Sequence, residues 1–115
     1  MMDELQQIFC GLKEIINEIN VQEIGSQIGM GDLKEWCDDT QYGFRKSLRK
    51  IRKKKPMTND MLKCFYDLFA IIKDVNQKEI GSQIESNNLN VWCHIWQNEA
   101  KARLAKLAKA VDNDN

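Results

Sequence analysis

Eight of the eleven residues from Arg45 to Lys55 are lysine or arginine, and the segment contains no acidic residue. On a helix these cations would share adjacent faces without acidic partners one turn away, an arrangement that is self-repelling and destabilising. Such a segment is typical of a surface that a polyanion neutralises, and its phosphate contacts would be salt-sensitive because binding releases counterions. The candidate nucleic-acid-binding residues are Arg45, Lys46, Arg49, Lys50, Arg52, Lys53, Lys54 and Lys55.

The basic segment could instead serve the fold itself or the localisation of the protein. Its cations could complement the carbonyl end of a helix dipole and pair with the acidic first third of the protein. Residues 50–56, KIRKKKP, could also act as a nuclear-import signal in a eukaryotic or viral source. The total charge is zero, but residues 1–40 carry −7, residues 41–55 carry +8 and the remainder carries −1. A binding partner would respond to this separation rather than to the total.

Few residues offer catalytic or metal-binding chemistry. The one histidine, His94, directly follows Cys93, and neighbours on a helix diverge, so the pair is a poor ligand set. We therefore expect no metal, no cofactor, no small-molecule substrate and no enzymatic activity. The four cysteines are interpreted as reduced thiols in the core. If the protein were exported, one disulfide within each half would be the alternative, joining Cys10 to Cys37 and Cys64 to Cys93.

The elements that must position the basic segment occur twice. Residues 23–37 and 79–93, at an offset of 56, are identical at nine of fifteen positions, and both end in Trp-Cys. A fixed internal period indicates a duplicated architecture. Apolar residues at helical spacing predict six helices and no strand. Short helices should begin at Asn20 and Asn76, each with a glutamate three residues later. The other predicted helices span residues 3–19, 32–55 with a kink or break near Gly43, 59–75, and 88–111.

The fold class predicted from this pattern is all-α. We expect one domain over residues 1–115, built from two similar three-helix units at about residues 3–55 and 59–111. The units should share one core and be related by an approximate twofold axis, because 56 residues alone form a marginal core. The contacts between units should involve the first helices and the tryptophan-bearing third helices, with Trp36, Trp92 and Trp96 buried.

The two halves differ most where the charge is concentrated. Arg49 and Arg52 correspond to Ala105 and Ala108, and Lys54 corresponds to Ala110. This divergence predicts a division of labour, in which the second half supports the structure and the first half contacts a partner.

Residues 22–36 also resemble a helix-turn-helix motif, with Ile24, Gly25, Ile28, Gly29 and Met30 at its apolar and small positions. The resemblance implies that the following helix enters a major groove. Asp32 and Glu35 in the first turn of that helix would oppose phosphates, so ordinary helix packing is the preferred interpretation.

The predicted function is a small regulatory or architectural protein that binds nucleic acid mainly through the phosphate backbone. The alternative is a protein-interaction module, such as an adaptor, inhibitor or self-assembling subunit, with complementary acidic and basic surfaces. The acidic N-terminus is unlike a secretory signal, and no apolar run reaches the length of a membrane span. We therefore expect an intracellular protein, cytoplasmic or nuclear, without a membrane partner.

Overall fold

The protein is all-helical over the residues that its computed structural model describes, which are 3–29 and 31–113. There is no strand within these ranges, as predicted from the helical spacing of apolar residues. Met30 of the helix-turn-helix resemblance lies outside them. The helices are α1 (Glu4–Glu18), α2 (Val21–Gly29), α3 (Leu33–Lys54), α4 (Asn59–Ile72), α5 (Gln77–Glu85) and α6 (Leu89–Asn113).

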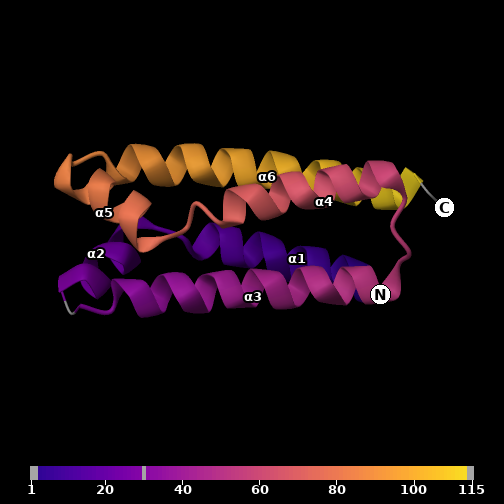
Figure 1. Cartoon of the computed structure of the whole chain (residues 1–115), viewed down its shortest axis with the longest axis horizontal. Helices are drawn as coiled ribbons and strands as arrows, with labels where there is room; N and C mark the ends of the chain where they lie inside the picture. The colour runs from indigo at the N-terminus through magenta and orange to yellow at the C-terminus, as the bar shows by residue number, and fades with distance from the viewer. Residues whose placement is uncertain (1–2, 30, 114–115) are drawn as a thin grey trace.

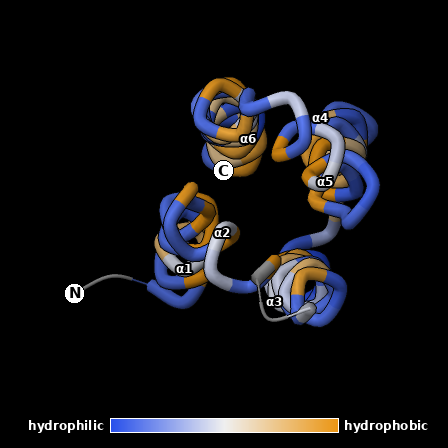
Figure 2. The backbone as a smooth tube through the Cα atoms, turned by 90° about the vertical axis from the view of Figure 1, so that its left-hand side faces the viewer, coloured by the Kyte–Doolittle hydropathy of each residue, from blue (hydrophilic) through white to orange (hydrophobic). Residues whose placement is uncertain are grey.

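Four long helices run side by side along a body of 46 × 22 × 20 Å, and the short helices α2 and α5 both lie at the same end of it (Figure 1). Viewed along the bundle, α1 lies between α3 and α6, and α4 lies between the same two helices on the opposite corner (Figure 2). Neighbouring long helices are antiparallel, as in an up-down-up-down bundle. The first helix of each half therefore packs against the third helix of the other half.

Side-chain caps begin the helices where the sequence indicates. Asp3 and Gln6 form a reciprocal capping box at α1, and Thr58 accepts a hydrogen bond from the Met61 amide at α4. The Asn20 side chain accepts from the Glu23 amide at 2.8 Å, and Asn76 accepts from Glu79 at 2.9 Å. These bonds satisfy amides that the first helical turn leaves without a partner.

Two pairs of helices follow the offset of 56. Helix α5 has the same bounds as α2 when 56 is added to the residue numbers, and α6 begins 56 residues after α3 begins. Two hydrogen bonds between the halves are also equivalent. The Gln41 side chain donates to the Val75 carbonyl at 2.6 Å, and Gln97 donates to Ile19 at 2.6 Å. Each glutamine reaches the carbonyl that follows the first helix of the other half. Reciprocal bonds of this kind are expected if a twofold axis relates the two halves. The twofold axis itself stays a prediction.

The predicted break in α3 and the predicted end of α4 were wrong. Helix α3 continues without a break through Gly43, whose added Cβ would lie 3.7 Å from the Ile15 Cδ1 atom of α1. Packing against α1 overrides the weak helix propensity of this stretch. Helix α4 ends at Ile72 rather than at Val75, although Val75 is fully buried.

A single hydrophobic cluster draws residues from both halves. Phe44 of α3 and Trp96 of α6 meet across the bundle with ring centroids 6.1 Å apart, and Trp92 stacks on Trp96 at 6.2 Å. The Trp96 indole donates to the Ile71 carbonyl at 3.0 Å. Trp92 and Trp96 are therefore core residues, as predicted, whereas Trp36 is only half-buried. Within the described ranges, no helix is long and apolar enough to cross a membrane.

Candidate nucleic-acid interface

The second half of α3 carries the whole predicted basic set except Lys55, which directly follows the helix. The helix ends there because the residue before Pro56 avoids helical torsions. Arg45 and Lys55 are half-buried, and the other six cations are exposed: Lys46, Arg49, Lys50, Arg52, Lys53 and Lys54. The last turn places Arg52, Lys53 and Lys54 beside the carbonyl end of the helix dipole, which moderates their repulsion.

Ion pairs within the described residues involve little of the positive charge of the exposed cations. Lys54 forms an ion pair with Glu4 at the start of α1. Within residues 3–29 and 31–113, no carboxylate lies within ion-pair distance of Arg45, Arg49 or Arg52. Pairing with the protein's own carboxylates therefore accounts for Lys54 but not for the three arginines.

Two of the arginines instead face aromatic rings of α4. The guanidinium of Arg45 lies 5.4 Å from the Phe69 ring centroid, and that of Arg52 lies 5.7 Å from the Phe65 centroid. Arg49 lies between Arg45 and Arg52 in α3. Together with Leu48 and Tyr66, these residues line a groove of about 260 Å³, here termed the arginine groove: Arg45, Leu48, Arg49, Arg52, Phe65, Tyr66 and Phe69.

The lysines form a separate row. Lys50, Lys53 and Lys54 line a second, open hollow of about 340 Å³. The basic segment therefore offers planar guanidinium groups beside aromatic rings in one hollow and flexible ammonium groups in the other. Guanidinium groups bind phosphate through two parallel bonds, whereas ammonium groups act as point charges.

The other half of the molecule contains an equivalent groove between α1 and α6. All seven of its lining residues are those of the arginine groove moved by 56 positions. Its volume is about 400 Å³, and Ala105 and Ala108 replace Arg49 and Arg52. We term it the alanine groove: Phe9, Cys10, Lys13, Lys101, Leu104, Ala105 and Ala108. The two halves thus have a groove at equivalent positions, but the residues that line the two grooves differ in chemistry.

Sequence reasoning identifies the cations of this interface but not its aromatic residues. The helical spacing places Phe65 and Phe69 in the core and gives no role to Tyr66. In the structure Phe65 is buried, Phe69 is half-buried, and Tyr66 is 57% exposed. The i, i+4, i+7 spacing of Arg45, Arg49 and Arg52 puts them on one face, and could have indicated that this face meets another helix.

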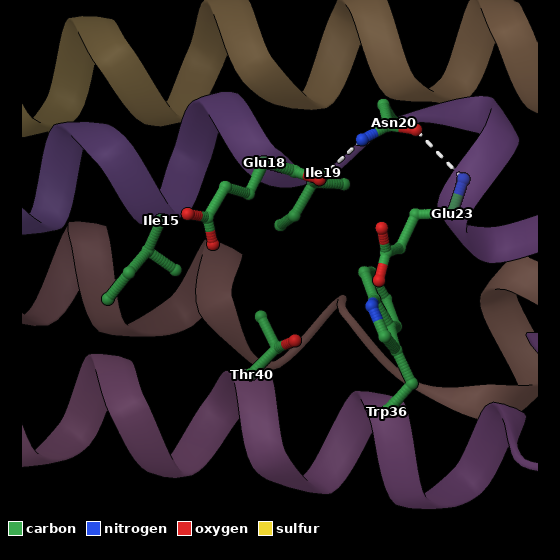
Figure 3. A pocket seen from close by; sticks show the side chains of 7 residues that line it. All are labelled: Ile15, Glu18, Ile19, Asn20, Glu23, Trp36 and Thr40. Atoms are coloured by element: carbon green, nitrogen blue, oxygen red, sulfur yellow. Dashed lines mark hydrogen bonds between the residues drawn. The ribbon is translucent and has the colours of Figure 1, made fainter.

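An acidic hollow of about 380 Å³ lies between α1, α2 and the start of α3, toward the opposite end of α3 from the basic segment. Its polar lining comes from Glu18, Asn20, Glu23 and Thr40, and the Trp36 indole forms one wall (Figure 3). At the position of Thr40 the second half has Trp96, whose ring fills the core there. The smaller threonine therefore helps to leave this hollow open.

The cysteines do not form the disulfides considered for an exported protein. Cys37 and Cys93 are buried thiols, so neither of the two pairings is made. Cys10 is exposed and Cys64 is half-buried, so the prediction that all four cysteines lie in the core was wrong for these two. Burial, with the Asp38 carboxylate as a second cause, raises the pKa of the Cys37 thiol to about 11. Burial also raises the pKa of Cys93. Among the described residues, no three His, Cys, Asp or Glu side chains gather in a way that could hold a metal ion.

Comparison with known proteins adds no identification. No protein-family model, no curated protein and no solved structure matches this sequence.

Proposed function

We propose that this protein binds nucleic acid, chiefly through the phosphate backbone, by the cations of α3 and the adjoining Lys55. The observation that supports this most is the set of exposed cations on α3, of which only Lys54 forms an ion pair with a carboxylate of the described residues. Charge of one sign gathered on an exposed helix attracts a polyanion and raises its rate of association. Backbone contacts of this kind position the ligand and carry little sequence information.

Comparison with the second half of the protein indicates that these cations bind a ligand and are not needed for folding. At the positions of Arg49 and Arg52 the alanine groove has Ala105 and Ala108 beside the same buried leucine, Leu104 in place of Leu48. Packing at this groove therefore does not require arginine. A cationic side chain that costs repulsion and is dispensable for packing is best explained by a partner of opposite charge.

The test compares two double variants. Arg49→Ala with Arg52→Ala gives the arginine groove the residues of its counterpart, and Lys106→Ala with Lys109→Ala removes the same charge from exposed positions on α6. Affinity for a short DNA duplex is measured over a range of salt concentrations. We expect wild-type affinity to fall steeply with salt, with a slope of about −0.9 per neutralised phosphate. The first variant should lose affinity and slope, and the second should keep both. Absence of wild-type binding at low salt both to the duplex and to a single strand with the same number of phosphates would refute the proposal.

A second candidate, a self-assembling or protein-binding module, is favoured by the acidic hollow. Glu18 and Glu23 lie at the α2 end of the bundle, while the basic segment ends at the opposite end of α3. Opposite charges at opposite ends suit a head-to-tail contact between copies. Analytical ultracentrifugation distinguishes the two functions. Salt-sensitive oligomers without nucleic acid, lost on Glu18→Lys with Glu23→Lys, would support assembly, and a monomer at all salt concentrations would exclude it.

A further inference from the structure

We propose that the arginine groove is a site for single-stranded nucleic acid, in which a base stacks on Tyr66 while the adjacent arginines hold its phosphates. This proposal deepens the proposed function and rests on it, since it names the strand form that the basic surface binds. The site combines one exposed aromatic ring and three guanidinium groups in a single groove.

Tyr66 would supply the stacking surface of the site. Its side chain is 57% exposed and lines the arginine groove, whereas Tyr42, which is also exposed, does not line it. The ring packs edge-on against Phe65, with centroids 5.7 Å apart and planes at 89°, so a buried neighbour braces it. A braced, exposed ring is a platform on which a base can stack, and stacking of this kind tolerates any base.

The arginines of the groove would supply its phosphate contacts. Phe69 and Phe65 lie beside the guanidinium groups of Arg45 and Arg52 and hold them along the groove. A cation–π contact uses the face of the guanidinium plane and leaves donors at its edge for phosphate oxygens. The Arg45 Nε atom is buried and has no hydrogen-bond partner among the described residues. Arg49, between Arg45 and Arg52 in α3, has no ion-pair partner within those residues.

The geometry favours a single strand over a duplex. Bases in a duplex are stacked on each other and expose only their edges, so they cannot cover an aromatic ring on a protein surface. A groove of about 260 Å³ suits a small planar group and the adjoining backbone rather than a double helix. The lysine row of Lys50, Lys53 and Lys54 lies on the same helix and can neutralise further phosphates of the strand.

Comparison with the alanine groove indicates which residues of the arginine groove would bind the single strand. Its equivalents of Tyr66, Arg49 and Arg52 are Cys10, Ala105 and Ala108, so it lacks both the platform and the paired guanidinium groups. The two grooves share Phe65 with Phe9 and Leu48 with Leu104, and both have a cation at the position of Arg45, which is Lys101 in the alanine groove. Lys13 replaces Phe69. The residues that distinguish the grooves therefore include the ring and the two arginines that the proposed ligand would contact.

The experiment measures binding of the full chain to oligodeoxythymidine, to a duplex with the same number of phosphates, and to polyglutamate, by fluorescence anisotropy at one low salt concentration. Wild type should prefer the single strand. Tyr66→Leu should weaken single-strand binding about tenfold and change duplex binding by less than about twofold, whereas Tyr66→Phe should keep both. A gain-of-function variant, Cys10→Tyr with Ala105→Arg and Ala108→Arg, should add a second single-strand site per chain.

Three results would overturn the proposal, and they are distinguishable. If Tyr66→Leu has no effect while Arg49→Ala with Arg52→Ala abolishes all binding, nucleic-acid binding stands and the stacking site does not. If polyglutamate competes as well as oligodeoxythymidine, the groove recognises charge alone. If neither nucleic acid binds wild type, the stacking site and the proposed function fall together.

Discussion

The guanidinium of Arg45 lies 5.4 Å from the centroid of the Phe69 ring, across the contact between α3 and α4. The Lys73 ammonium approaches the same ring at 5.3 Å. An aromatic ring therefore faces two cations where a carboxylate would ordinarily be expected. Because such a ring attracts cations without neutralising them, the helix keeps its positive charge available to a ligand.

This contact should be measurable as a coupling energy. Phe69→Leu removes the ring and should lower the free energy of unfolding by about 1 kcal/mol. A double-mutant cycle with Arg45→Met should give a coupling of about 0.5–1 kcal/mol in urea unfolding. Strictly additive losses would show that the ring contributes packing alone. The equivalent pair in the alanine groove, Lys101 and Lys13, offers a control cycle without a ring, in which no favourable coupling is expected.

The reciprocal glutamines should stabilise the junction between the halves. Gln97 donates to the Ile16, Asn17 and Ile19 carbonyls at the end of α1, at 3.0, 3.4 and 2.6 Å. Gln97→Ala leaves these carbonyls with fewer donors and should lower the free energy of unfolding by about 1–2 kcal/mol. Gln41→Ala removes a single bond to Val75 and should cost about 1 kcal/mol. Chemical denaturation compares the two, and equal stability of both variants and wild type would contradict this role.

Trp96 should contribute more to stability than Trp36. Trp96 is 3% exposed and donates to the Ile71 carbonyl, so Trp96→Phe loses both volume and a hydrogen bond. We expect a loss of about 2 kcal/mol in the free energy of unfolding. Trp36→Phe, at a half-buried site beside the acidic hollow, should cost less than about 1 kcal/mol. The reverse order in thermal or urea unfolding would contradict the assignment of Trp96 to the core.

The buried thiol of Cys37 should make stability fall at high pH. Its folded pKa of about 11 exceeds the ordinary value of 9.0, so the unfolded chain releases this proton first. The native state then binds more protons, and stability should decrease as pH rises from about 9 toward 11. Cys37→Ala should flatten this part of the pH profile relative to wild type. A profile unchanged by Cys37→Ala would contradict a buried, protonated thiol.

Much of the architecture could be predicted because it depends on local patterns. Apolar spacing and the caps at Asn20, Thr58 and Asn76 are read within a few residues, and the corresponding helices begin where predicted. The uninterrupted α3 could not be predicted in this way. Gly43 lies where α3 packs close to Ile15 of α1, and the sequence around Gly43 does not show this packing between helices.

The candidate interface could likewise be predicted only in part from the sequence. The cations could be identified because charge is visible in the sequence, and the offset of 56 shows where Ala105 and Ala108 replace arginine. Which cations stand beside Phe65 and Phe69 depends on how α3 meets α4, and this follows from packing between elements distant in the chain.

The most direct test of the central claim is a residue-by-residue map of ligand contact. Amide chemical shifts of isotope-labelled protein are recorded during titration with oligodeoxythymidine at low salt. We predict that perturbations concentrate on residues 45–55 and 65–69, while the equivalent positions 101–111 and 9–13 remain unchanged. Shifts confined to the alanine groove or the acidic hollow, or no shifts at all, would contradict the account.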